Sequence, residues 1–145
     1  MNNAQYIYPM KKLVFIIDDD PVYLNFMKGH FKQMPDFETR VFQTGPEGFA
    51  ALDQAKPYLI ILDHLFTNAP DKTGLDYLKE IRKKQSGVPV IYITGLNDEN
   101  LKVKTKKLKV ADHILKNDAF LVHLRTAMDK LNKPQTGILG KLFKK

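Results

Sequence analysis

Acidic residues follow two apolar segments of the sequence and are the first candidates for chemistry. The segments span residues 13–17 and 58–62, and the acids that end them are Asp18, Asp19 and Asp20 after the first and Asp63 after the second. Carboxylates that are brought together repel one another unless a cation is bound, and oxygen ligands of this kind suit Mg²⁺. A lone carboxylate beside Mg²⁺ and a lysine is suited to nucleophilic attack on phosphorus, so Asp63 is the candidate for an acyl phosphate.

Two further polar side chains end apolar segments and complete the expected chemistry. Lys116 follows residues 111–115, and Thr94 ends another such run. Phosphoryl transfer depends mainly on positioning and on stabilising charge, which a lysine and a bound cation supply. The Thr94 hydroxyl adds a hydrogen-bond donor. Asp20 lies immediately before Pro21, where a helix cap is favoured, so we interpret it as a cap and leave it out of the site.

Five apolar runs and five helical patterns alternate along the chain. Strands are expected at residues 13–17, 37–42, 58–62, 88–93 and 111–115. Helices are expected from Pro21 to before Pro35, from 46 to about 55, from Gly74 through Ile81, from a cap at Asn97 or Asp98 to about 108, and from a cap at Asn117 or Asp118 to before Pro134. The alternation predicts an α/β fold, a doubly wound (βα)5 three-layer sandwich with a five-stranded parallel sheet. The carboxyl ends of the strands lie at one edge of such a sheet, which brings the acids, Thr94 and Lys116 together.

The composition is that of one globular domain with a basic surplus. The chain has 145 residues, 43% of them apolar and 27% charged, and its 23 Lys and Arg against 16 Asp and Glu give a net charge of +7. It has no Cys, which excludes disulfides, thiolate metal sites and a Cys nucleophile. Its longest apolar runs have about five residues, far short of the roughly 20 of a transmembrane helix. We expect a cytoplasmic protein with an extension over residues 1–10, a domain over 11–131 and a basic tail over 132–145.

Four separated segments resemble the receiver domain of two-component response regulators. They are Phe15–Pro21, which contains the acidic pair, Leu59–Asp63, Val90–Gly95 and Ala111–Lys116. The resemblance covers residues 11–131 and implies a flavodoxin-like fold in which Asp63 accepts a phosphoryl group from a histidine kinase or histidine phosphotransferase. It also implies a Mg²⁺ (or Mn²⁺) site formed by Asp19, Asp63, the backbone carbonyl of Leu65 and, through water, Asp18. The residues that would stabilise the phosphoryl group or switch with it are Thr94, Lys116 and His113.

The sequence departs from the family pattern at three places. The proline and glycine that usually follow the phosphoacceptor at four and eight residues are Pro70 and Gly74, seven and eleven residues on, which indicates a three-residue insertion. His113 stands where the family usually has tyrosine or phenylalanine, so its coupling to the switch threonine is in doubt. Asn117 replaces a common proline, and we attach no functional meaning to it. His64 is interpreted as a solvated residue on the rim of the site.

The expected function is that of a stand-alone receiver that signals through protein contacts and does not turn over a substrate. Only 14 residues follow residue 131, too few for a DNA-binding or enzymatic module. One alternative is a degenerate receiver that binds a partner without phosphorylation, through the lysine-rich helix at 102–109 and the tail. Nucleic acid or membrane binding by the same lysines is a second alternative. A phosphatase or phosphotransferase with an Asp nucleophile is a third, but no general acid or substrate cap is visible for it.

Overall fold

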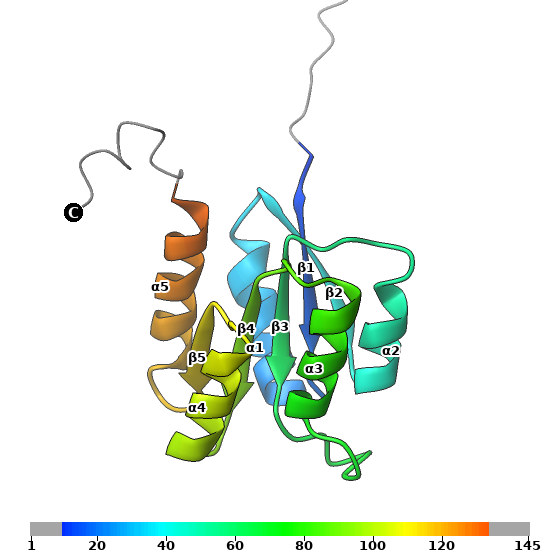
Figure 1. Ribbon diagram of the computed structural model, residues 1–145. Coiled ribbons are helices and arrows are strands. Elements are labelled where there is room, and N and C mark those ends of the chain that lie inside the picture. The colour runs from blue at the N-terminus through cyan, green and yellow to red at the C-terminus, as the bar shows by residue number, and fades with distance from the viewer. Residues whose placement is uncertain (1–9, 134–145) are drawn as a thin grey trace, which may run out of the picture.

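Strands and helices alternate along the whole of the described chain. The computed structural model describes residues 10–133. The strands are β1 (Lys12–Ile17), β2 (Phe37–Phe42), β3 (Leu59–Asp63), β4 (Val90–Thr94) and β5 (Asp112–Leu115). The helices are α1 (Pro21–Lys32), α2 (Gly45–Ala51), α3 (Gly74–Lys84), α4 (Glu99–Lys107) and α5 (Phe120–Asn132). The predicted (βα)5 order is confirmed (Figure 1).

The five strands form one parallel sheet whose order creates a switch point. The order is β2-β1-β3-β4-β5, and every neighbouring pair is parallel. The chain first moves outward from β1 to β2 and then returns past β1 to β3, so the direction of winding reverses between these two central strands. In open α/β sheets a crevice opens at this point, beyond the carboxyl ends of the strands. The strand arrows of Figure 1 point toward that edge, at the bottom of the view.

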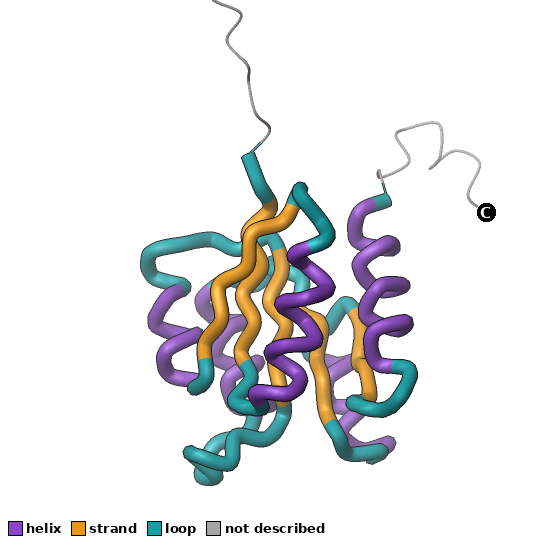
Figure 2. The backbone as a smooth tube through the Cα atoms, turned by 180° about the vertical axis from the view of Figure 1, so that it is seen from behind, coloured by secondary structure: helices purple, strands orange, loops and turns teal. Residues whose placement is uncertain are grey.

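Helices cover both faces of the sheet and give the predicted three layers. Figure 2 shows α1 and α5 in front of one face, whereas α2, α3 and α4 lie on the other, which faces the viewer in Figure 1. Side chains of β1 alternate between the two layers: Val14 and Ile16 belong to the core under α1 and α5, and Phe15 and Ile17 to the opposite core. All four are at most 1% exposed, so the prediction of a strand buried on both faces is confirmed.

Two helix boundaries differ from the prediction. The helix expected to reach about residue 55 ends at Ala51, because the chain tightens there into successive turns with hydrogen bonds from Leu52 N–H to Phe49 O and from Gln54 N–H to Ala51 O, both at 3.1 Å. The cap expected for α5 at Asn117 or Asp118 is wrong. Ala119 occupies the cap position without a side-chain bond, and Asn117 Oδ1 instead accepts from Ala119 N–H at 3.0 Å within the preceding turn.

Other predicted caps are confirmed. Asp20 Oδ1 accepts from Val22 N–H at 2.9 Å at the start of α1, and Asp98 caps α4. Within residues 10–133 no helix is long and apolar enough to span a membrane. The predicted N-terminal extension and basic tail lie outside the described residues, apart from Met10, Asn132 at the end of α5 and its C-cap Lys133.

Candidate functional site

The ends of four strands form a pocket lined by polar side chains at the switch point. Asp18 follows β1, Asp63 ends β3, Thr94 ends β4 and Lys116 follows β5. Backbone hydrogen bonds continue between the strand ends, from Asp18 N–H to Phe42 O at 3.0 Å and from Lys116 N–H to Thr94 O at 2.8 Å. The parallel sheet therefore delivers residues that are far apart in sequence to one edge, as the strand-end rule predicted.

Lys116 bridges two buried carboxylates at the base of this pocket. Its Nζ lies 2.8 Å from Asp18 Oδ2 and 3.1 Å from Asp63 Oδ1, and Asp18 and Asp63 are 0% and 4% exposed. The ammonium also lies 4.7 Å from the ring centroid of Tyr23, a cation–π distance that helps to fix its position. Burial lowers the pKa of Lys116, but the charges of Asp63 and Asp18 outweigh it and raise the pKa, so this lysine stays charged.

Asp63 is held in an unusual electrostatic environment. Burial, and then the neighbouring Asp18 carboxylate, raise its pKa to about 8, while Lys116 acts in the opposite direction. The single ammonium therefore does not neutralise the acidic pocket. An additional positive charge would restore the ionised form of Asp63.

The donor set fits a hard divalent cation. Carboxylate oxygens of Asp18, Asp19 and Asp63 all lie within 4.8 Å of one another. Three carboxylates against one ammonium leave an excess of negative charge, and oxygen donors of this kind are those preferred by Mg²⁺ and Mn²⁺. Leu65 lines the same pocket with a half-exposed side chain. The cluster of three carboxylates predicted from the sequence is thus present.

Thr94 adds a hydroxyl to the lining of the pocket. Thr94 is fully buried and lines the pocket together with Gly95, Asp63 and Lys116. Its Oγ1 accepts a hydrogen bond from Leu96 N–H at 3.0 Å, so the hydroxyl proton remains available as a donor. A Cβ added at Gly95 would meet no atom within 4 Å, which leaves this wall open. The arrangement provides a donor and free space beside the Asp63 carboxylate.

His113 lies outside the acidic pocket. It is half-buried on β5, where its ring stacks on Tyr92 of β4 and its Nδ1 lies 2.9 Å from Thr105 Oγ1 of α4. Burial and then the charge of Lys102 lower the pKa of His113. The ring therefore packs between the sheet and α4 and does not line the pocket that holds Asp63.

His64 is a correction to the sequence interpretation. This residue was expected to be solvated, but it is half-buried and its Nδ1 lies 2.5 Å from the Tyr92 hydroxyl. Burial lowers its pKa, which favours a neutral imidazole. Sequence reasoning missed this contact because Tyr92 is one of several apolar and aromatic residues in a buried strand and carries no polar pattern of its own.

Thr67 is a second residue that the sequence did not single out. It belongs to the loop between β3 and α3, which contains the three-residue insertion, and both its N–H and its hydroxyl donate to Asp19 Oδ2 at 2.8 Å. Gly74 closes this loop with a hydrogen bond from its N–H to His64 O at 2.7 Å. The inserted loop thus contacts the pocket, although nothing in its spacing identified Thr67.

Comparison with known proteins agrees with this fold. A family model described as response regulator receiver domain matches residues 14–130. The chain therefore belongs to the response regulator receiver domain family, and the resemblance found in its four segments is confirmed.

Individual relatives are distant in sequence but close in structure. The chain is 28% identical over 108 residues to the probable C4-dicarboxylate response regulator DctR of Halalkalibacterium halodurans, a match that covers 74% of this chain and 46% of that protein. The chain therefore spans less than half the length of this curated relative. A CheY-like receiver domain protein from Methanospirillum hungatei superposes with a TM-score of 0.73 at 24% identity, covering 83% of this chain and 94% of that one. The Thermotoga maritima response regulator TrrA, solved in complex with Mg²⁺-BeF, superposes with a TM-score of 0.70 at 22% identity. This match covers 83% of this chain and 98% of that one.

Proposed function

We propose that Asp63 accepts a phosphoryl group from the phosphohistidine of a histidine kinase or histidine phosphotransferase. The observation that carries this proposal is the Lys116 bridge between Asp18 and Asp63 inside a buried acidic pocket. In the transfer, a carboxylate oxygen of Asp63 forms a bond to phosphorus as the bond from phosphorus to the donor imidazole nitrogen breaks. The product is an acyl phosphate on Asp63. Receiver domains interact with such donors, which supports the choice of partner.

The residues around Asp63 have distinct expected roles. Asp19, Asp63, the Leu65 carbonyl and, through water, Asp18 would hold Mg²⁺ or Mn²⁺, which supplies positive charge to the phosphoryl oxygens. Lys116 already contacts Asp63 and would move its ion pair to a phosphoryl oxygen. Thr94 would donate its free hydroxyl proton to another. The phosphoryl group stays on Asp63, the residue that accepts it. We therefore propose a signalling phosphoacceptor with self-catalysed transfer and hydrolysis, not an enzyme that turns over a substrate.

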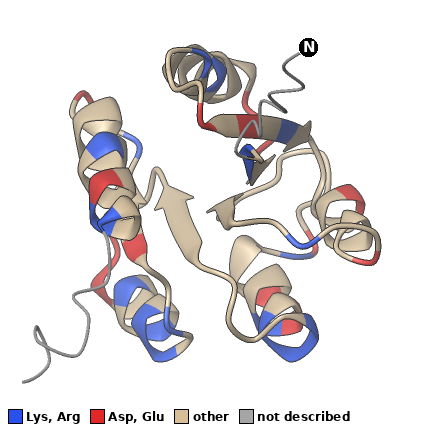
Figure 3. Cartoon of the chain, turned by 90° about the horizontal axis from the view of Figure 1, so that it is seen from above, with Lys and Arg blue, Asp and Glu red and all other residues tan. Residues whose placement is uncertain are grey.

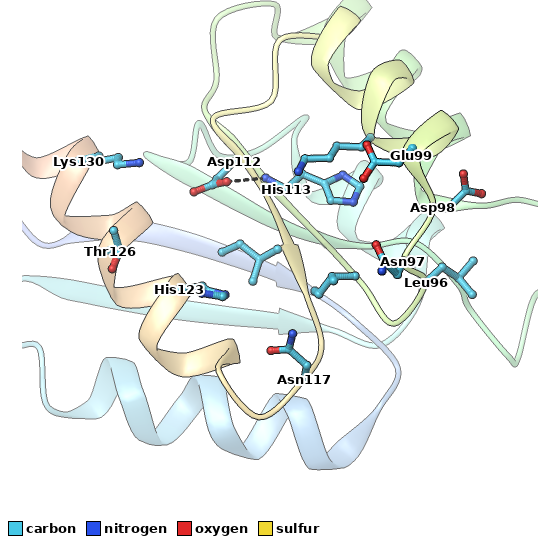
Figure 4. A pocket seen from close by; sticks show the side chains of 13 residues that line it. Leu96, Asn97, Asp98, Glu99, Asp112, His113, Asn117, His123, Thr126 and Lys130 are labelled. Carbon is cyan, nitrogen blue, oxygen red and sulfur yellow. Dashed lines mark hydrogen bonds between the residues drawn. The ribbon is translucent and has the colours of Figure 1, made fainter.

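The signal is proposed to pass to a partner protein through the face formed by α4, β5 and α5. A hollow of about 350 Å³ lies on this face, with His113, Asp112 and Glu99 on one side and His123 of α5 on the other (Figure 4). The His113 ring joins this hollow to Tyr92 in the sheet. A change near Asp63 that moves either ring would therefore alter the surface. Action without an attached output domain, and in the cytoplasm, stay predictions.

A phosphorylation-independent binding module is the second candidate. The observation in its favour is the cluster of exposed lysines on α4: Lys102, Lys104, Lys106 and Lys107. Lys and Arg are blue in Figure 3. Such a cluster attracts acidic partners whether or not Asp63 is modified. The two candidates differ in whether Asp63 reacts.

The deciding experiment is intact mass spectrometry after incubation with Mg²⁺ and acetyl phosphate. The chain is expected to gain one phosphoryl group, and chelation or Asp63→Asn is expected to abolish the gain. Asp71→Asn, an exposed carboxylate of the neighbouring loop, is the matched control and should react like the unchanged chain. No gain in the folded chain would contradict the phosphoacceptor proposal and favour binding through α4.

A further inference from the structure

Asp19 is held differently from the other two carboxylates of the pocket. Asp18 and Asp63 pair with Lys116, whereas Asp19 Oδ2 accepts two hydrogen bonds from Thr67, from the backbone N–H and from the hydroxyl, both at 2.8 Å. Across residues 10–133 the Asp19 side chain makes no other hydrogen bond or ion pair. One oxygen of Asp19 is thus fixed by Thr67, and the other is left without a protein partner.

The loop that carries Thr67 is itself anchored. The adjacent residue, Phe66, is 2% exposed and packs edge-on against Tyr77 of α3, with ring centroids 5.7 Å apart. The Ala69 N–H donates to Phe66 O at 3.2 Å and forms a turn around Thr67. A buried aromatic ring and a local turn therefore set the position of an exposed threonine. Its contact with Asp19 joins the β3–α3 loop to the end of β1.

We propose that Thr67 is a positioning residue for the divalent cation site, acting through Asp19. The inference rests on the proposed function, since it takes the three carboxylates to be cation ligands. Two hydrogen bonds to Oδ2 restrict rotation of the carboxylate and leave Oδ1 as the oxygen to be offered to a cation. Hydrogen bonds to a ligating carboxylate set its orientation, and their loss typically costs about 10- to 100-fold in metal affinity.

The position of Thr67 departs from the usual family pattern. Thr67 lies four residues after Asp63, where the usual family pattern has a proline, and here the proline is displaced to Pro70. A proline in place of Thr67 would have neither an N–H nor a hydroxyl to donate. With the proline displaced, Thr67 stands at this position and supplies two donors to Asp19.

The test is Mn²⁺ affinity of the full chain, measured near neutral pH by electron paramagnetic resonance of free Mn²⁺. Thr67→Val keeps the shape and the N–H but removes the hydroxyl, and it is expected to weaken binding by about tenfold, the lower end of the usual range, because one of two bonds remains. Thr67→Ala should weaken binding similarly, and Thr67→Ser should restore it. Thr126→Val is the matched control, since the Thr126 hydroxyl bonds only to Val122 O in its own helix, at 3.0 Å.

Three results would overturn the inference. Binding of Mn²⁺ by Thr67→Val as tightly as by the unchanged chain would remove the role of the hydroxyl while leaving the proposed phosphoacceptor function intact. Weakening that Thr67→Ser fails to restore would assign the effect to loop shape. A chain that binds no Mn²⁺ at all, although folded by circular dichroism, would reject the cation site itself and the Thr67 inference with it.

Discussion

The imidazole of His113 stacks on the ring of Tyr92, with centroids 5.7 Å apart and planes inclined by 26°. The two residues are direct neighbours across β4 and β5. The Tyr92 hydroxyl lies 2.5 Å from Nδ1 of His64, the residue that follows Asp63 in the sequence. On the other side, the Thr105 hydroxyl donates to Lys102 O at 3.0 Å, and its oxygen lies 2.9 Å from His113 Nδ1. A continuous series of contacts therefore leads from the residue beside Asp63 to α4.

This series predicts that occupation of the pocket changes the environment of His113. Addition of Mg²⁺ and beryllofluoride, which mimics a phosphoryl group, is expected to shift the His113 ring resonances and its pKa in NMR spectra. The reason is that the His113 ring contacts both Tyr92 and Thr105 of α4 directly, so a movement of either one changes its surroundings. His30 of α1, which is half-buried on the other face of the sheet, is the internal control and should not shift. Unchanged His113 resonances in a chain that binds the mimic would rule out His113 as the switch residue.

The raised pKa of Asp63 predicts an unusual pH dependence for the metal-free protein. In the unfolded chain Asp63 loses its proton near its ordinary pKa of 3.8, whereas burial and Asp18 hold the proton up to about pH 8 in the folded chain. Between these values the folded state binds more protons, so the free energy of unfolding falls as pH rises. Thermal unfolding in chelator should therefore show a midpoint that decreases across this window, and Mg²⁺ should reverse the decrease.

Asp63→Asn separates this effect from other titrations. Without an ionisable group at residue 63, the metal-free variant should be more stable than the unchanged chain at pH 8, by at least about 1.4 kcal/mol, the equivalent of one pKa unit. Asp71→Asn, in the exposed loop, should leave the pH profile unaltered. Equal stability of Asp63→Asn and the unchanged chain at pH 8 would show that Asp63 does not carry the dependence.

Whether the sequence predicts a feature depends on whether that feature is set by a local pattern or by contacts between segments far apart in the chain. Strand β1 and the position of Asp63 were predictable because a doubly buried strand needs a continuous apolar run, which ends where the polar edge begins. The contact of Thr67 with Asp19 was not, because its geometry depends on how Phe66 is buried under α3. The Tyr92 bond to His64 also required the register of β3 against β4. Hydrophobic patterns of period two or 3.6 predict the strands and helices. Contacts between loops and strands can be determined only once the sheet is assembled.

Gly74 is predicted to tolerate no side chain. Its Cα packs so closely beneath the end of β3 that a Cβ would collide with the carbonyl oxygen of Asp63 and lie 2.9 Å from the Tyr92 hydroxyl. Gly74→Ala should therefore lower the free energy of unfolding by about 1–3 kcal/mol, the usual cost of overpacking. The measurement is urea unfolding followed by circular dichroism. Gly29→Ala is the opposite control: a Cβ there meets nothing within 4 Å inside α1, so this variant should gain up to about 1 kcal/mol. A neutral Gly74→Ala would show that the loop and the site can shift to make room.

Arg82 is predicted to stabilise the end of α4 through its guanidinium group. From α3 it donates to Leu108 O at 2.7 Å, to Val88 O at 2.7 Å and to Lys109 O at 3.1 Å. Two of these oxygens belong to Leu108 and Lys109, which follow α4, and have no partner within the helix. Lys109 leaves the helix with a φ of 60°, a conformation that costs a non-glycine residue energy.

Arg82→Lys keeps the charge but not the planar set of donors. It should lower the free energy of unfolding by about 1–3 kcal/mol and increase amide hydrogen exchange in α4, whereas Arg125→Lys on the exposed face of α5 should do neither. Normal protection of α4 in Arg82→Lys would mean that the packing of Leu101 and Thr105, both buried, is sufficient to hold this helix against the sheet.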